Sequence, residues 1–414
     1  MEALVISPVA DDEHELLAAL TLRAFSPLIM HQRVFGDVDP AVHVTSLAAR
    51  ARSAAQKPNC QIVKATRGGT PVGYAVWTTP SSDPAATEGD PSEPDTSGDR
   101  FPPGTNLELA NELFGSEHKK IEEPHFYVGT LAVDPAAQGG RIGSALLRHI
   151  CKQADEQAVP VHLSATSGGL SLYERFGFEL HGEPQRPTSD PDIVLYPLRR
   201  EPIVLVSATR DDLPGLASLH RLAFEPTKIM RYLHTDVDPD VFNEFFVKRF
   251  TKVMNEAEEK NNGGSVITVA KRGWKPLGFA WTTREPAAKD RPAEEKEKPE
   301  RPLMEGADPV RSRELLGALD RHANTVPFPH WNLHILSIDP AAQGAGVGKR
   351  LLRSAIDLAV AENLPLTLES TEFGLPLYRS SGFRDFAEII VAEQDKDVKL
   401  WPMVFGSTSS TEVV

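Results

Sequence analysis

The chain has 414 residues, a formal net charge of −14, 40% hydrophobic residues and 25% charged residues. This length and composition predict about two to three globular domains. We expect no nucleic-acid partner, because phosphate backbones are bound by basic surfaces. The two cysteines, Cys60 and Cys151, have no C-x-x-C spacing, which indicates free thiols in a reducing compartment.

The first twenty residues carry acidic side chains where a secretory signal would have a basic start and an apolar run. No stretch approaches the roughly 18 apolar residues of a membrane span. We therefore expect a cytoplasmic protein without a membrane partner, and the nucleus stays open as a compartment. The sequence has no H-E-x-x-H or similar pattern, so no metal is expected.

The chain contains an internal repeat with a period near 200 residues. Ala24-Phe25 recurs at Ala223-Phe224, an offset of 199, and Asp134–Gly139 recurs unchanged at Asp339–Gly344, an offset of 205. Other patterns that occur twice are Asp37–Pro40 with Asp236–Pro239, Gly73-Tyr-Ala with Gly278-Phe-Ala, each followed closely by Trp-Thr-Thr, and Leu172-Tyr173 with Leu377-Tyr378. A period this long indicates a duplicated domain, with copies at 1–200 and 201–406 and a disordered tail at 407–414.

Both copies show the same order of expected elements. An apolar strand comes first and is followed by helices that begin near Asp11 or Asp211 and continue to about Gln56 or Glu259. The expected strands are Ala3–Ser7, Gln61–Ala65, Val72–Thr78 and Val159–Ser164 in copy one, and Ile203–Ser207, Val266–Ala270, Leu277–Thr282, Leu333–Ile338 and Leu364–Ser370 in copy two. The order predicts an α/β fold in each copy, with a mixed, mostly antiparallel twisted sheet flanked by helices.

Each copy is interrupted by an insert, at 80–104 and at 284–309. The first is rich in Pro, Asp, Glu, Ser and Gly, and the second is a run of mixed charge. We expect both to be flexible surface loops without a packed core, in preference to partner-binding segments. A short helix is expected after each insert, at about 107–118 and 310–322.

A glycine-rich turn follows the strand Leu333–Ile338. Asp339–Gln343 forms the turn, and Gly344, Gly346 and Gly348 open a helix. Such a turn leaves several backbone N–H groups at a helix N-terminus, which is a site for an anion. The spacing fits neither the Walker A loop nor the G-x-G-x-x-G dinucleotide fingerprint.

The turn matches Q-x-x-G-x-G at Gln343, Gly346 and Gly348, and Leu377-Tyr378 precedes Gly382-Phe383 as L-Y-x-x-x-G-F. Together these motifs resemble those of the GNAT N-acetyltransferases, and the chain is similar to a set of fungal GNAT-like proteins. The resemblance covers both halves and implies two tandem GNAT domains. It further implies acetyl-CoA as co-substrate, a primary amine as acceptor, and direct attack in a ternary complex. The acceptor and the oligomeric state stay open; the charge of −14 slightly favours a cation.

The resemblance also assigns residues in copy two. Leu336 and Ile338 would pair with the pantetheine arm through their backbones, and Tyr378 would be the acid that protonates the sulfur. The pyrophosphate would lie against Gln343, Gly344, Ala345, Gly346, Val347, Gly348 and Lys349. The weaker counterparts in copy one are Val133, Gln138, Gly139, Gly140, Arg141, Gly143 and Tyr173. Tyr378 could instead be a ring that packs under the Gly-Phe turn.

Two side chains are candidate bases. His334 resembles the imidazole of the L-H-x-L-x-V/I strand in arylalkylamine N-acetyltransferases, and an imidazole titrates near neutral pH. By period two, His334 is expected to share a face with Leu336 and Ile338. Glu369, at the end of the next core strand, is the alternative base. A buried core histidine and an ion-paired strand end are the structural alternatives for these two residues.

Copy one departs from this pattern at three positions. Arg141 replaces the central glycine, Gly129 stands at the His334 position and Ser164 at the Glu369 position. We therefore expect copy two to be catalytic and copy one to be degenerate, as in tandem GNAT proteins with one active half. The alternatives are a non-catalytic acyl-CoA-binding sensor or scaffold, and an interaction protein that kept only the fold.

Overall fold

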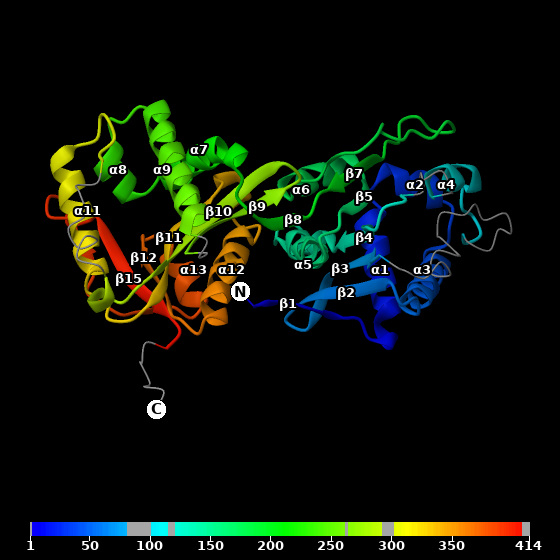
Figure 1. The fold of residues 1–414 in the computed structure, drawn as a ribbon. Coiled ribbons are helices and arrows are strands. Elements are labelled where there is room, and N and C mark those ends of the chain that lie inside the picture. The colour runs from blue at the N-terminus through cyan, green and yellow to red at the C-terminus, as the bar shows by residue number, and fades with distance from the viewer. Residues whose placement is uncertain (1, 81–100, 115–120, 261–263, 292–301, 408–414) are drawn as a thin grey trace. The chain divides into compact units, whose positions relative to one another are not determined.

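The computed structural model describes residues 2–80, 101–114, 121–260, 264–291 and 302–407. The chain divides into two compact units, Met1–Pro202 and Ile203–Val414. Each unit contains one copy of the repeat (Figure 1). Each is built on one mixed, mostly antiparallel sheet with helices beside it, which confirms the fold predicted from the sequence.

Unit 1 has thirteen named helices and strands in its described part, besides short 3-10 turns. In chain order they are β1 (Leu4–Pro8), α1 (His14–Phe25), α2 (Ile29–Phe35), α3 (Pro40–Ala55), β2 (Cys60–Arg67), β3 (Thr70–Thr78), α4 (Leu107–Phe114), β4 (Phe126–Val133), α5 (Ile142–Gln157), β5 (Val161–Ala165), α6 (Leu170–Arg175), β6 (Glu179–Leu180) and β7 (Tyr196–Arg200). The sheet has the order β1-β2-β3-β4-β5-β7-β6. Strands β4 and β5 are its parallel neighbours.

Unit 2 repeats this order with small additions. Its elements are β8 (Ile203–Ser207), α7 (Leu213–Phe224), α8 (Lys228–His234), α9 (Pro239–Lys260), β9 (Ser265–Arg272), β10 (Lys275–Glu285), α11 (Pro309–Ala323), β11 (His330–Ile338), α12 (Val347–Ala361), β12 (Leu366–Ser370), α13 (Leu375–Ser380), β13 (Arg384–Asp385), β14 (Ile390–Val391) and β15 (Lys399–Phe405). The sheet has the order β13-β15-β12-β11-β10-β9-β8, and β14 pairs with β15. Strands β11 and β12 are its parallel neighbours.

Different helices cover the two faces of the unit 2 sheet. Helix α12 packs on one face through buried residues that recur every three or four positions, which is the apolar stripe of an amphipathic helix. They are Val347, Leu351, Leu352, Ala355, Ile356 and Ala359. Helices α7 and α9 pack on the other face through Leu216, Phe242 and Phe250. Burying each such side chain stabilises the fold by roughly 2 kcal/mol. The two layers hold β10 and β11 rigid between them.

The repeated Asp-Val-Asp-Pro motif is a helix start. The carboxylate of Asp39 accepts from the backbone N–H groups of Ala41 (2.9 Å) and Val42 (3.1 Å) at the beginning of α3. Asp238 accepts from Asp240 N–H (2.8 Å) at the beginning of α9. An Asp at the N-cap accepts hydrogen bonds from the free N–H groups of the first turn, and Pro is favoured at the first helical position. The motif therefore explains the helix boundary and carries no site residue.

The described ends of both inserts are packed, contrary to the expectation of loops without a core. Arg284 and Glu285 extend β10, and beyond them Arg291 and Met304 are buried. In unit 1, Phe101 is buried against α4. The prediction missed these side chains because it used the average composition of each insert, in which a few buried residues have little weight. Residues 81–100, 292–301 and the tail 408–414 lie outside the described residues, as does the end of the helix expected at 107–118.

The repeated Trp-Thr-Thr pattern does not mark equivalent positions. In the strand register Val76 pairs with Thr130, and Trp281 pairs with Ile335, so Trp281 corresponds to Val76 and not to Trp77. Trp77 is buried with α5, while Trp281 lies in the cluster with α7 and α9. A shift of one residue reverses the face of a strand side chain. Trp281 consequently lies beside the candidate base His334.

Candidate active site

The site in unit 2 is organised by a β-bulge at His334. Along β10 the register passes from Trp281 opposite Ile335 to Thr282 opposite Leu333, so His334 is the extra residue of the bulge. A bulge reverses the alternation of faces beyond it. Leu336 and Ile338 therefore pack with α12, whereas the His334 ring lies 4.6 Å from the Trp281 ring on the other face. The prediction that the three residues share a face was wrong for this reason.

Beyond Asn332, strands β11 and β12 separate. They pair at Trp331 with Leu366 and at Asn332 with Thr367, and β11 then continues to Ile338 without β12 beside it. This stretch of β11 therefore has an edge with no neighbouring strand in the described residues. An open edge can pair with an extended ligand through main-chain hydrogen bonds. Leu336 and Ile338 lie on this stretch, where the predicted pantetheine arm would run.

The glycine turn at the end of β11 is shaped for close approach of a ligand. Asp339 accepts from Ala341 N–H (2.9 Å), and Gln343 closes the short turn. Gly344 and Gly346 have φ of +78° and +86°, a region that favours glycine. A Cβ added at either position would meet no atom within 4 Å, so the space over the turn is open.

Helix α12 begins directly after this turn without a side-chain cap. Within the described residues, the backbone N–H groups of Val347, Gly348 and Lys349 have no acceptor. These N–H groups and the helix dipole make a site for an anion such as a pyrophosphate. At the third glycine, Gly348, an added Cβ would lie in ordinary contact with Leu377 and Ile338, at 3.5 and 3.6 Å.

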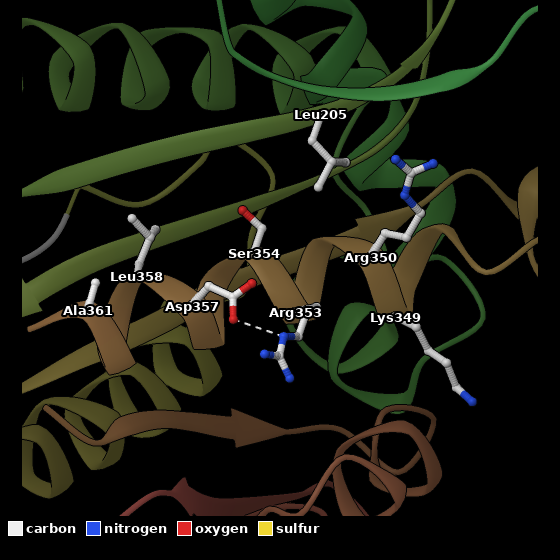
Figure 2. A pocket seen from close by; sticks show the side chains of 8 residues that line it. All are labelled: Leu205, Lys349, Arg350, Arg353, Ser354, Asp357, Leu358 and Ala361. Carbon is white, nitrogen blue, oxygen red and sulfur yellow. Dashed lines mark ion pairs between the residues drawn. The ribbon is translucent and has the colours of Figure 1, made fainter. Parts of the chain in front are cut away.

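A groove runs along the outer side of α12 from the same helix end (Figure 2). It has a volume of about 640 Å³ and is lined by Leu205, Lys349, Arg350, Arg353, Ser354, Asp357, Leu358 and Ala361. Arg350 donates to the Ile203 carbonyl (2.7 Å), and Arg353 is paired with Asp357 (2.8 Å). Lys349 lies at the end of the groove nearest the glycine turn, where an ammonium supports an anion.

Tyr378 lies on α13 and is buried, with its ring 5.6 Å from the Phe383 ring. Burial raises its pKa far above the ordinary phenol value, so the hydroxyl keeps its proton at neutral pH. That hydroxyl forms no hydrogen bond with another residue in the described part of the chain. The ring is therefore part of the core, and its hydroxyl carries a proton at neutral pH.

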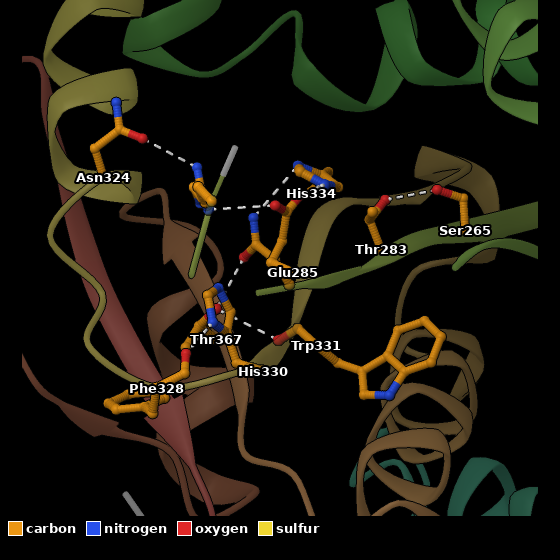
Figure 3. Close-up of polar contacts among 11 residues, drawn as sticks. Ser265, Thr283, Glu285, Asn324, Phe328, His330, Trp331, His334 and Thr367 are labelled. Carbon is orange, nitrogen blue, oxygen red and sulfur yellow. Dashed lines mark hydrogen bonds and ion pairs between the residues drawn. The ribbon is translucent and has the colours of Figure 1, made fainter. Parts of the chain in front are cut away.

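His334 lies in a set of polar side chains that the sequence did not reveal (Figure 3). Its Nδ1 is 3.3 Å from Asn332 Nδ2, and its Nε2 is 4.0 Å from Glu285 Oε1. Glu285 in turn accepts from Arg291 (3.2 Å). Glu285 and Arg291 both belong to the stretch assigned to the second insert. The only sequence signal for Glu285 was the continuation of β10 beyond Thr282.

Glu369 lies at the end of β12, where the sequence placed it, but it has a different partner. Its Oε1 is 3.6 Å from Nε2 of His322 on α11. Burial lowers the pKa of His322, so this imidazole is neutral at neutral pH and forms no ion pair there. The two candidate bases thus belong to two separate His–Glu pairs.

Unit 1 keeps the frame of this site and lacks its polar side chains. Gly129 occupies the bulge, and Ser164, near Tyr127 (3.5 Å), lies one residue before the end of β5. Arg141 holds the N-cap of α5 at φ +60°, the conformation that Gly346 has in unit 2. Tyr173 is retained, and burial raises its pKa to about 12. Of the remaining predicted residues, Gln138, Gly139 and Gly140 form the same turn, Val133 ends β4 and Gly143 lies in the first turn of α5.

The described residues contain no group of three or more His, Cys, Asp or Glu side chains arranged to hold a metal ion. The helices of the same part of the chain include none that is long and apolar enough to cross a membrane.

Comparison with known proteins gives matches in both units. Acetyltransferase (GNAT) domain models match residues 108–180 and 311–404. N-alpha-acetyltransferase RimI of Mycobacterium tuberculosis is 39% identical over 67 residues, which is 16% of this chain and 42% of the relative. The matched region therefore spans less than half of that relative.

Among solved structures, one described as histone acetyltransferase HPA2 and related acetyltransferase from Corynebacterium glutamicum is 20% identical, with a TM-score of 0.33 over 50% of this chain and 98% of its own. The PaiA N-acetyltransferase of Thermoplasma acidophilum, solved in complex with coenzyme A, is 10% identical, with a TM-score of 0.30 over 48% and 99%.

Each of the two units thus contains one region that matches a GNAT acetyltransferase domain. The two matches support a tandem arrangement of GNAT acetyltransferase domains.

Proposed function

We propose that unit 2 transfers an acetyl group from acetyl-CoA to a primary amine by direct attack in a ternary complex. The observation that supports this most is the convergence of three features: the open edge of β11, the uncapped N-terminus of α12, and the protonated hydroxyl of Tyr378. Acetyl-CoA would supply the activated acetyl group as a thioester. Gln343–Lys349 would hold its pyrophosphate, and Leu336 and Ile338 its pantetheine arm.

Each catalytic role follows from the chemistry of acyl transfer. The acceptor must lose a proton, which His334 would take, with Glu369 as the alternative base. Tyr378 would donate its proton to the departing sulfur. Positioning of the two substrates supplies much of the rate, because the reaction has no covalent enzyme intermediate. The acceptor is an amine of unspecified identity, and Glu285 beside His334 favours one that arrives as an ammonium ion.

The experiment is an assay of thiol release from acetyl-CoA with a panel of arylalkylamines, polyamines, amino sugars and peptide amines. We expect amine-dependent release, and product with the added acetyl mass. Slow release without an acceptor would still indicate a working site. Binding of acetyl-CoA with no release under any condition would support the alternative of a non-catalytic sensor or scaffold.

For unit 1 we propose a degenerate site. It keeps the turn and the phenol of Tyr173 but has Gly129 and Ser164 in place of both candidate bases. Arg141 would put a long side chain where the pyrophosphate must come close to the protein backbone. Transfer by unit 1 would contradict this proposal. The double variant His334→Gln with Glu369→Gln exposes it, because unit 2 then has neither candidate base and any activity left would come from unit 1.

A further inference from the structure

The surroundings of His334 are those of an imidazole that takes up a proton. Each ring nitrogen faces a polar side chain, Nδ1 facing Asn332 at 3.3 Å and Nε2 facing the Glu285 carboxylate at 4.0 Å. The Asn332 oxygen also accepts from Thr367 (3.1 Å), which leaves the amide nitrogen toward Nδ1. In this arrangement Nδ1 is the ring nitrogen without a hydrogen, and Nε2–H points toward Glu285.

A second layer supports Glu285. Arg291 donates from Nη2 to Glu285 Oε2 (3.2 Å) and from Nη1 to Asn324 Oδ1 (3.2 Å) at the end of α11. The Arg291 side chain is only 6% exposed, and that of Glu285 is 22% exposed. A guanidinium that is nearly buried and donates to two fixed acceptors holds a carboxylate in one orientation. Its other oxygen, Oε1, is the one that faces His334.

We propose that Glu285 and Arg291 are positioning residues that prepare His334 to accept the proton of the acceptor amine. Glu285 stabilises the imidazolium, and Arg291 fixes and moderates the charge of Glu285. The inference rests on the proposed transferase function of unit 2. Unit 1 offers a contrast, because Gly129 occupies its bulge and the strand there ends at Thr78, with Pro80 at the position equivalent to Glu285.

The step balances as follows. The acceptor ammonium gives one proton to His334 Nδ1, and Asn332 turns its amide so that the oxygen accepts from the new N–H. The amine lone pair then forms the bond to the acetyl carbon while the carbon–sulfur bond breaks. The thiolate takes the phenolic proton of Tyr378. The second amine proton and the imidazolium proton pass to solvent or to the phenolate as the site resets.

The proposal predicts how the charges around His334 set its titration. Glu285 on β10 favours the imidazolium, whereas Arg291 behind it disfavours it. Arg249 on α9, stacked 5.1 Å above the Trp281 ring, adds a second positive charge on that side. The reach of Arg291 is visible at His330, whose pKa burial lowers first and the Arg291 charge lowers further, to about 4. Removal of Glu285 and removal of Arg291 should therefore have opposite effects.

The first test follows the His334 imidazole by NMR titration of the free protein, assigned with His334→Gln. Glu285→Gln should lower the pKa of His334 by about one unit, and Arg291→Met should raise it. Arg291→Lys keeps the charge and should restore the wild-type value. The matched control is Glu362→Gln, which removes an exposed carboxylate paired with Arg284, next to Glu285. A titration unchanged by both Glu285→Gln and Arg291→Met overturns the proposal.

The second test compares pH profiles of kcat/KM for variants whose melting temperatures match the wild type. The acidic limb should move to lower pH in Glu285→Gln and to higher pH in Arg291→Met, with kcat reduced about tenfold or more in the former and acetyl-CoA affinity kept. If kcat/KM falls in these variants and the acidic limb of the profile does not move, Glu285 and Arg291 have a structural role only, which overturns the proposal. If the wild type transfers no acetyl group, the proposed function fails, while the NMR titration still decides the charge relation.

Discussion

Tyr378 combines a buried ring with a hydroxyl that keeps its proton, and the structural role of the ring can be separated from the proposed role of the hydroxyl. Removal of the hydroxyl leaves the ring contact with Phe383 intact. We predict that Tyr378→Phe lowers kcat about 100-fold, because general acid catalysis contributes on that order, with acetyl-CoA Kd changed less than about twofold. Stopped-flow turnover and calorimetric binding would measure the two quantities. Equal losses in both would assign Tyr378 to binding.

His220 is the residue whose titration bears most directly on stability. It is fully buried on α7, 2.9 Å from Ser337 Oγ, and burial lowers its pKa to about 3. The unfolded chain takes up this proton near pH 6.5 and the folded chain does not, so stability is lost as pH falls below about 6.5, until about pH 3. One such histidine costs about 2 kcal/mol between pH 7 and 5.

We predict that His220→Gln, which can keep a bond to Ser337, lowers stability at pH 7 but flattens its dependence on pH. Urea unfolding of unit 2 at pH 7 and at pH 5, followed in the full chain, measures the change in the free energy of unfolding. An unaltered slope of unfolding free energy against pH would show that His220 is already charged in the fold.

The sequence predicted some of the individual site residues and missed others. Tyr378, His334 and Glu369 were found from motifs and strand ends, and the structure places each on the expected element. Glu285 was missed because it lies 49 positions before His334, in a charged run, and only the pairing of β10 with β11 brings them together. His322 was missed in the same way, since α11 meets β12 only in three dimensions.

At the scale of elements, alternation and capping signals predicted most boundaries. Strand β8 was predicted at its observed limits, and the helices that end near 56 and 259 were located to within a residue or so. The bulge in β11 was not predicted, because one extra residue in a strand has no composition of its own. That bulge decides which face His334 occupies, so the site geometry could not be obtained from period two alone.

The glycine turn yields the prediction that belongs to this scale. Gly346→Arg copies Arg141 into unit 2 and forces a side chain to φ +86°, a strain of about 1 kcal/mol or more. We expect acetyl-CoA affinity to fall at least about tenfold, through strain and through the side chain in the open space over the turn. Calorimetry and circular dichroism would separate binding from folding.

The reciprocal variant is Arg141→Gly in unit 1, which relieves the same strain. Turnover should stay at the wild-type value, because unit 1 has no counterpart of His334 or Glu285. If turnover instead rises or falls with substitutions at Arg141, and Gly346→Arg leaves it intact, the active half is unit 1.

At the scale of the whole molecule, the duplication was the strongest inference from the sequence. The two matched GNAT domains lie one in each unit, at 108–180 and 311–404, as the repeat predicted. A long repeat is visible in sequence because caps, glycine turns and strand ends each leave a residue signature. The proposal that unit 2 is catalytic and unit 1 degenerate rests instead on the few positions at which the two units differ.

The most direct measurement is a calorimetric titration of acetyl-CoA into the full chain, with the number of sites as the result. We predict one site per wild-type chain, weakened at least about tenfold by Gly346→Arg and left in place in unit 2 by Arg141→Gly. Two sites would contradict the degenerate first unit. Absence of binding would contradict the transferase function of the second.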